Sequence, residues 1–156
     1  MDADASGQPA PAGRAATVSL AFPPEPRLLG TVRLVVSIVA RKAGMDEEAV
    51  EDLKVAVSEA CAVAVGDLNR AGRPDLIELD MIETADRVGV EVRDRAPPAG
   101  NPAPPSAADG ELSDRELGLA LVGALVDDLQ IAALEGGGNR TSFWLRRGPE
   151  VPPPLT

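Results

Sequence analysis

The chain has 156 residues, which is enough for one domain with a buried core. Its formal net charge is −10, which argues against nucleic acid or an anionic membrane surface as its main partner. It contains no histidine and one cysteine, Cys61, so the sequence excludes histidine-based catalytic triads, zinc sites and an internal disulfide. The lone cysteine and the lack of a leader or a membrane-length apolar run predict a cytoplasmic protein.

Composition predicts one central domain, residues 16–147, between two tails. Residues 1–15 are rich in Ala, Pro, Gly and Asp without periodicity, which predicts a disordered tail. Residues 148–156 are Pro-rich and predict a second, polyproline-like tail.

The first half of the domain predicts a strand, two helices and a hairpin. Residues 17–22 alternate polar and apolar side chains, as a strand does. Residues 24–44 place apolar side chains at helical spacing and end in a basic turn and a glycine. A second helix is expected over 46–69, because its acidic start favours a helix N-terminus. Residues 75–83 and 86–94 alternate with period two and predict an antiparallel hairpin.

The second half opens with a Pro-rich loop over 95–111, and loops of this length inside a domain are functional or disordered. Residues 113–129 predict a helix with Ser113 or Asp114 as its N-cap. Residues 130–147 predict two strands around a glycine-rich turn. Helices grouped on one face of a mostly antiparallel sheet give an α+β two-layer sandwich.

Four segments, in this order and at this spacing, resemble the anti-sigma-factor serine-protein kinases, which share the Bergerat ATP-binding fold with histidine kinases and gyrase-type ATPases. The segments are "DLKVAVSEACAVAV", "VEVRDRAPPAG", "LGLALVGALVDDL" and "GGGNRTSFWL". The resemblance covers residues 17–147 and implies ATP and magnesium as cofactors, with the loop 95–111 as a lid. It also implies three protein partners: an RNA polymerase sigma factor, an anti-anti-sigma antagonist with a STAS domain, and a second copy of the chain.

The helix motif keeps the acid of this family and lacks its metal ligand. By resemblance, Glu59 matches the base that accepts a proton from the serine being phosphorylated. Relatives place a magnesium-binding asparagine four residues later on the same helical face. Val63 stands there in this chain and offers no oxygen to a cation that requires oxygen ligands. Glu59 is therefore predicted to be a vestigial base, with no metal at the site.

The first glycine motif is altered in the same direction. Asp94 matches the aspartate that hydrogen-bonds the adenine amine in relatives. Ala96 and Pro98 stand where that motif has glycines, and neither allows the positive φ that glycine permits.

The other two glycine motifs are partly kept. Gly118 matches the second motif, but Glu116 replaces its earlier glycine and would repel phosphates. Gly138 matches the third motif, where Asn139 replaces the usual threonine. These positions together predict a degenerate nucleotide site.

Several of these residues also have ordinary structural interpretations. Glu59 is then a solvent-facing helix residue, Asp94 a turn former, and Cys61 a small core residue. Arg27 and Arg33, near the start of the first helix, are either solvated or contacts for acidic groups of a partner.

Two functional hypotheses follow. In the first, the chain is an anti-sigma-like binding protein that controls transcription by partner switching and uses no cofactor. In the second, it is an active serine-protein kinase that binds ATP through Asp94, Gly118 and Gly138, with Asp67 as a distant candidate for the metal ligand. Titration with Mg-ATP separates the two.

Overall fold

The computed structural model describes residues 18–98 and 113–148. The tail predicted over 1–15, nearly all of the tail predicted over 148–156, and most of the loop predicted over 95–111 lie outside the described residues.

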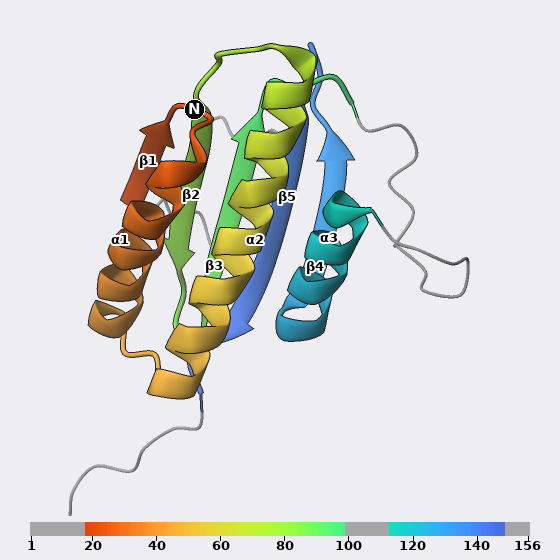
Figure 1. Cartoon of the computed structure of the whole chain (residues 1–156). Coiled ribbons are helices and arrows are strands. Elements are labelled where there is room, and N and C mark those ends of the chain that lie inside the picture. Colours follow the sequence, from red (N-terminus) through yellow and green to blue (C-terminus); the bar gives the residue numbers. More distant parts are fainter. Residues whose placement is uncertain (1–17, 99–112, 149–156) are drawn as a thin grey trace, which may run out of the picture.

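The described residues form one five-stranded sheet with every neighbouring pair antiparallel. The strand order is β1-β2-β3-β5-β4, which leaves β1 and β4 as the two edges (Figure 1). The strands are β1 (Val18–Phe22), β2 (Ile77–Glu83), β3 (Arg87–Asp94), β4 (Asp127–Ala133) and β5 (Asn139–Arg146).

Three α-helices cover one face of this sheet (Figure 1). They are α1 (Leu29–Lys42), preceded by a one-turn 3-10 helix η3 (Pro26–Leu28), α2 (Glu47–Ala71) and α3 (Asp114–Leu125). The long helix α2 runs along the middle of the layer, between α1 and α3 (Figure 1). This arrangement confirms the predicted α+β two-layer sandwich.

The central helix α2 begins and ends as its sequence requires. The carboxylate of Asp46 accepts a hydrogen bond from the backbone N–H of Ala49 at 2.8 Å and caps the helix N-terminus. Gly72 ends the helix in a left-handed conformation, with φ 65°. Its buried face is built from small and branched apolar residues that pack on the sheet, and Cys61 among them is fully buried. This burial confirms the interpretation of Cys61 as a core residue, and it raises the pKa of the thiol to about 12.

One predicted boundary is wrong. The helix expected over 113–129 ends at Leu125, and β4 begins at Asp127. Asp128 adopts φ 54°, and the ladder with β5 shifts register between Asp127 and Gln130, which marks a β-bulge. Pairing with β5 outweighs the local helical pattern here, and aspartate tolerates the left-handed backbone that the bulge needs.

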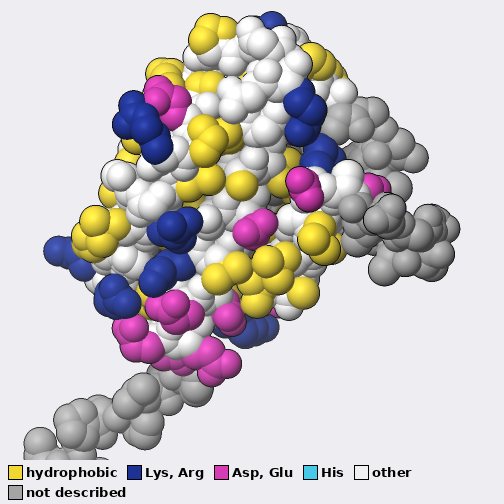
Figure 2. Space-filling view, in the orientation of Figure 1, with side chains coloured by type: hydrophobic (Ala, Val, Ile, Leu, Met, Phe, Trp, Pro, Cys, Tyr) yellow, Lys and Arg dark blue, Asp and Glu magenta, His cyan; other side chains and the backbone are white. Residues whose placement is uncertain are grey.

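The helix-bearing face exposes both charged and apolar side chains (Figure 2). The large exposed apolar residues of the helices are Leu34 and Ile38 on α1, Val55 on α2, and Leu117 and Leu121 on α3. No helix within residues 18–98 and 113–148 is long and apolar enough to cross a membrane.

Candidate functional site

The contact between α2 and α3 brings together three residues that the sequence singled out. Gly118 of α3 faces the turn of α2 that carries Glu59 and Val63. A Cβ atom added at Gly118 would lie 3.2 Å from Oε1 of Glu59 and 3.3 Å from Cγ2 of Val63. Glycine therefore lets α3 approach α2 closely at this turn.

The Glu59 carboxylate lies beside this contact without a cationic partner. The side chain is half-buried, and no hydrogen bond or ion pair joins it to the residues that the structure describes. Val63, one turn further along, presents only methyl groups. Within the described ranges no three His, Cys, Asp or Glu side chains gather into a group that could hold a metal ion. Of the two α2 side chains that face Gly118, only Glu59 therefore offers oxygen ligands to a cation.

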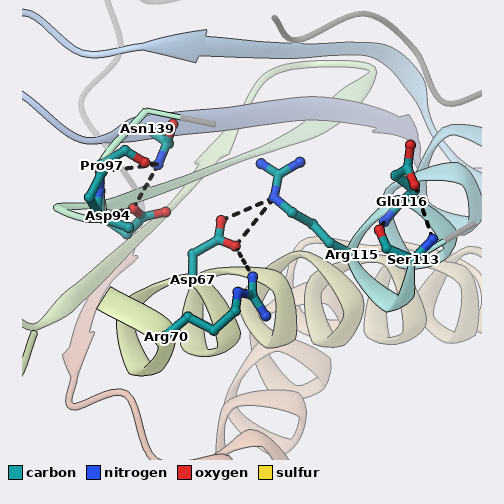
Figure 3. A network of polar contacts seen from close by, with 9 residues as sticks. Asp67, Arg70, Asp94, Pro97, Ser113, Arg115, Glu116 and Asn139 are labelled. Atoms are coloured by element: carbon teal, nitrogen blue, oxygen red, sulfur yellow. Dashed lines mark hydrogen bonds and ion pairs between the residues drawn. The ribbon is translucent and has the colours of Figure 1, made fainter. Parts of the chain in front are cut away.

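Asp67, two turns beyond Glu59 on α2, is held by two arginines (Figure 3). Nε of Arg115, from the first turn of α3, lies 3.3 Å and 3.2 Å from the two carboxylate oxygens. Arg70 forms an ion pair with the same carboxylate from within α2. The Asp67 side chain is only 11% exposed, so both guanidinium groups neutralise a largely buried charge.

A cavity of about 420 Å³ opens next to this cluster. It is lined by Asp67, Arg70, Ala71, Pro97 and Arg115. The cavity therefore lies between the end of α2, the start of α3 and the turn that follows β3. Arg115 was not singled out from the sequence, because its partner is 48 residues away in the chain.

Asp94 ends β3 as a buried carboxylate with partners from the chain itself (Figure 3). The residue is 6% exposed. Its Oδ1 accepts hydrogen bonds from the backbone N–H of Ala96 at 2.8 Å and from Nδ2 of Asn139 at 3.1 Å. Burial raises the pKa of the Asp94 carboxyl above its ordinary value, and these two hydrogen bonds oppose that rise.

The third glycine motif packs directly on the first. Asn139 pairs with Asp94 across the β3–β5 ladder. Gly138 has φ 111°, and a Cβ atom added there would lie 2.2 Å from the carbonyl oxygen of Asp94, so only glycine fits. Ala96 is 1% exposed and belongs to the hydrophobic core, whereas Pro98 is exposed.

Glu116 has a structural role that the resemblance did not suggest. Its carboxylate accepts the backbone N–H of Ser113 at 3.0 Å, and the Ser113 hydroxyl accepts the backbone N–H of Glu116 at 3.1 Å. This reciprocal pair is a capping box at the start of α3. The hydrogen bond from the Ser113 backbone lowers the pKa of Glu116. A serine three residues before a glutamate is the sequence signal that predicts this cap.

The two arginines considered for partner binding differ in their surroundings. Arg27 lies in η3, is 74% exposed, and forms an ion pair with Glu25 at 2.7 Å. Arg33 reaches across from α1 and donates a hydrogen bond to Oγ of Ser58 at 2.8 Å, next to Glu59 on α2. Arg27 is therefore available to a partner, whereas Arg33 also ties α1 to α2.

Comparisons with known proteins match the chain to one family model and to several relatives. The sequence signature of the histidine kinase-like ATPase domain matches residues 22–144. The serine-protein kinase RsbW of Bacillus velezensis is 32% identical over 127 residues, which cover 76% of this chain and 79% of the relative. RsbW of Bacillus subtilis is 30% identical over 122 residues, which cover 73% and 76% of the two chains. RsbW of Listeria monocytogenes is 29% identical over 117 residues, which cover 75% and 69%.

Proposed function

The chain belongs to the histidine kinase-like ATPase domain family, together with the RsbW serine-protein kinases, and from this premise we propose that it is an anti-sigma-like regulator. It acts through protein contacts, as a partner-switching protein that does not use ATP. Its partners are a sigma factor of RNA polymerase and a STAS-domain antagonist. Neither nucleic acid nor a membrane takes part, because the chain carries a net charge of −10.

The two α2 residues that follow Glu59 on the same helical face, Val63 and Asp67, support this proposal best. Nucleotide phosphates need magnesium or cationic groups opposite them, and magnesium needs oxygen ligands. Val63 supplies no oxygen, and the carboxylate of Asp67 already pairs with Arg115 and Arg70. In this proposal, Asp67 engages the two arginines, so neither Asp67 nor these guanidinium groups are free to hold magnesium or phosphate.

The turn after β3 supports the same proposal independently. The Asp94 carboxylate is buried and accepts two hydrogen bonds from the chain, and the Ala96 methyl group is in the core. In this proposal, the Asp94 oxygen that a ligand could engage is already occupied by donors of the chain itself. The family supplies ATP-dependent phosphoryl transfer when nucleotide and magnesium are bound; here the residues hold the turn and the helices in place instead.

Partner choice in such a protein depends on competition or on another kinase. Without its own phosphoryl transfer, the chain is switched by the relative amounts of its partners, or by the phosphorylation state of the antagonist. Arg27 offers an exposed positive charge to an acidic partner surface.

A second candidate function is an active serine-protein kinase. The observation that favours it is Glu59, which is half-buried and has no hydrogen-bond or ion-pair partner within the described residues. A cavity of about 420 Å³ opens two turns further along the same helix, at Asp67. A free carboxylate such as that of Glu59 is what a general base requires.

The proposal is tested by pull-down of a STAS-domain antagonist and a sigma factor, with and without Mg-ATP. Binding that does not change with nucleotide supports the regulator, whereas a complex that forms only with ATP supports the kinase. Arg27→Ala should weaken capture of whichever of these two partners presents an acidic surface to Arg27. Arg73→Ala is the matched control, because Arg73 also pairs with an acid two residues away in the sequence, Asp75 at 3.1 Å.

Self-association is part of the proposal, and the α1 side of the molecule is the surface that suits it. The edge strand β1 contains no charged residue, and α1 lies beside it (Figure 1). Helix α1 exposes Leu34 (59%) and Ile38 (49%) one turn apart. Unprotected edges and exposed apolar helix faces favour pairing with another chain. The opposite edge strand, β4, carries two aspartates and a bulge, which discourage such pairing.

A further inference from the structure

The turn that follows β3 has an unusual shortage of hydrogen-bond donors. Its residues after Ala96 are Pro97 and Pro98, and proline has no backbone N–H. The backbone carbonyls of this turn are therefore not matched by N–H groups of the turn itself. Because Ala96 is only 1% exposed, water does not readily replace these donors, and another part of the chain has to supply them.

The side-chain amide of Asn139 supplies them (Figure 3). Its Nδ2 lies 3.1 Å from Oδ1 of Asp94, 3.3 Å from the carbonyl oxygen of Ala96 and 3.4 Å from that of Pro97. An amide group carries two hydrogens and can share them among three acceptors. One side chain on β5 thus binds three groups of the turn on β3.

We propose that Asn139 is a positioning residue that fixes the turn at Asp94–Pro97 from within the protein, so that this turn keeps its shape without any ligand. Asn139 is 5% exposed and lies directly opposite Asp94 in the ladder, so its position is set by the strand register. The amide also occupies one oxygen of Asp94 and removes it as a free acceptor.

The role requires a hydrogen-bond donor, which distinguishes it from packing. Aspartate has nearly the same shape as asparagine but offers two acceptors and no donor when ionised. An aspartate at this position would place a second carboxylate about a hydrogen-bond length from Asp94, and the two would repel. The pair would need a shared proton, which is present only at low pH.

Asn139 holds this turn whether or not the chain uses ATP. A wild-type protein that binds Mg-ATP would contradict the proposed function and leave the role of Asn139 intact. The tests below therefore contain no nucleotide.

The first test is thermal unfolding of the full chain and of Asn139→Asp at about pH 7 and about pH 4.5. The variant gains a carboxyl group whose folded-state pKa is raised, so its stability is present at low pH and lost as pH rises through that pKa. The unfolding temperature of Asn139→Asp should lie about 5–10 °C below that of the wild type at pH 7, and clearly less far below it at pH 4.5. Asn69→Asp, at an exposed position near the end of α2, is the matched control and should show no such difference between the two pH values.

The second test uses Asn139→Ala and hydrogen exchange at the Ala96 amide, which donates to Asp94. Loss of the Asn139 donor should speed exchange at Ala96 by about tenfold or more, whereas Asn69→Ala should leave it unchanged. An Asn139→Asp variant that loses the same stability at both pH values, or an Ala96 amide equally protected in Asn139→Ala, would overturn the inference. If Asn139→Asp does not fold at pH 7, refolding at pH 4.5 supports the inference and failure at both pH values contradicts it.

Discussion

Gly118 on α3 packs directly against Val63 on α2, because a Cβ atom added at the glycine would lie 3.3 Å from Cγ2 of the valine. The position at which relatives are expected to hold a metal is thus a helix–helix contact in this chain. Val63 contributes to the attachment of α3, and its hydrocarbon surface suits that contact.

Gly118→Ala should weaken the attachment of α3. Alanine normally stabilises a helix by about 1 kcal/mol relative to glycine. Here its methyl group would press on Val63, which is held between two helices, and overpacking costs about 1–3 kcal/mol. Gly123→Ala is the matched control in the same helix, since the nearest atom of the described residues to its Cβ atom would be Cδ2 of Leu129 at 3.5 Å. In urea denaturation, the free energy of unfolding of Gly118→Ala should be at least about 1 kcal/mol lower than that of Gly123→Ala. Equal free energies of unfolding would show that α3 shifts freely on α2.

Asp67→Asn should release the start of α3. The carboxylate is 11% exposed and receives Arg115 from α3 and Arg70 from α2. Loss of its charge removes hydrogen bonds to charged groups, at a cost of about 1.5–3 kcal/mol. Arg70→Ala should cost less than about 1 kcal/mol, because the Arg70 side chain is 65% exposed and its ion pair is screened by solvent.

Hydrogen exchange distinguishes a local from a global effect of Asp67→Asn. The amides in the first turns of α3 should exchange faster in Asp67→Asn and in Arg115→Ala, but not in Arg70→Ala. Equal exchange in all three variants would mean that the cross-helix ion pair does not hold α3.

Local periodicity was sufficient to predict most of the fold. The hairpin of β2 and β3 followed from alternation, because Ile77, Leu79 and Met81 all face the core. The end of α3 was mispredicted, because pairing of β4 with β5 is a long-range interaction that outweighs the helical pattern of its residues.

The candidate site was predicted as a set of positions but not as a set of contacts. The sequence shows Asn139 only as a replacement for threonine. Its hydrogen bond to Asp94, 45 positions earlier, depends on the register of β3 and β5. Arg115 was missed for the same reason. Glu116 is the opposite case, since a local serine–glutamate spacing predicts its capping box and the resemblance predicted phosphate repulsion.

Leu34→Glu should convert a dimer into a monomer. A buried carboxylate at the proposed α1 surface would have no partner, and its desolvation opposes association. Leu117→Glu is the matched control, because Leu117 on α3 is 58% exposed and Leu34 is 59% exposed. Light scattering over about 1–100 μM should give twice 16.1 kDa for wild type and Leu117→Glu, and 16.1 kDa for Leu34→Glu. A wild type that stays monomeric, or a dimer that survives Leu34→Glu, would contradict self-association through α1.

Calorimetric titration of the wild type with Mg-ATP tests the central claim most directly, with Val63→Asn as the companion variant. Loss of one charge-assisted contact costs about 1.5–3 kcal/mol, which is one to two powers of ten in affinity. The altered turn at Asp94 and the paired Asp67 should weaken binding further. We predict no measurable binding at about millimolar nucleotide, and no rescue by Val63→Asn alone. Micromolar binding by the wild type, or restoration of binding by that single substitution, would contradict the account.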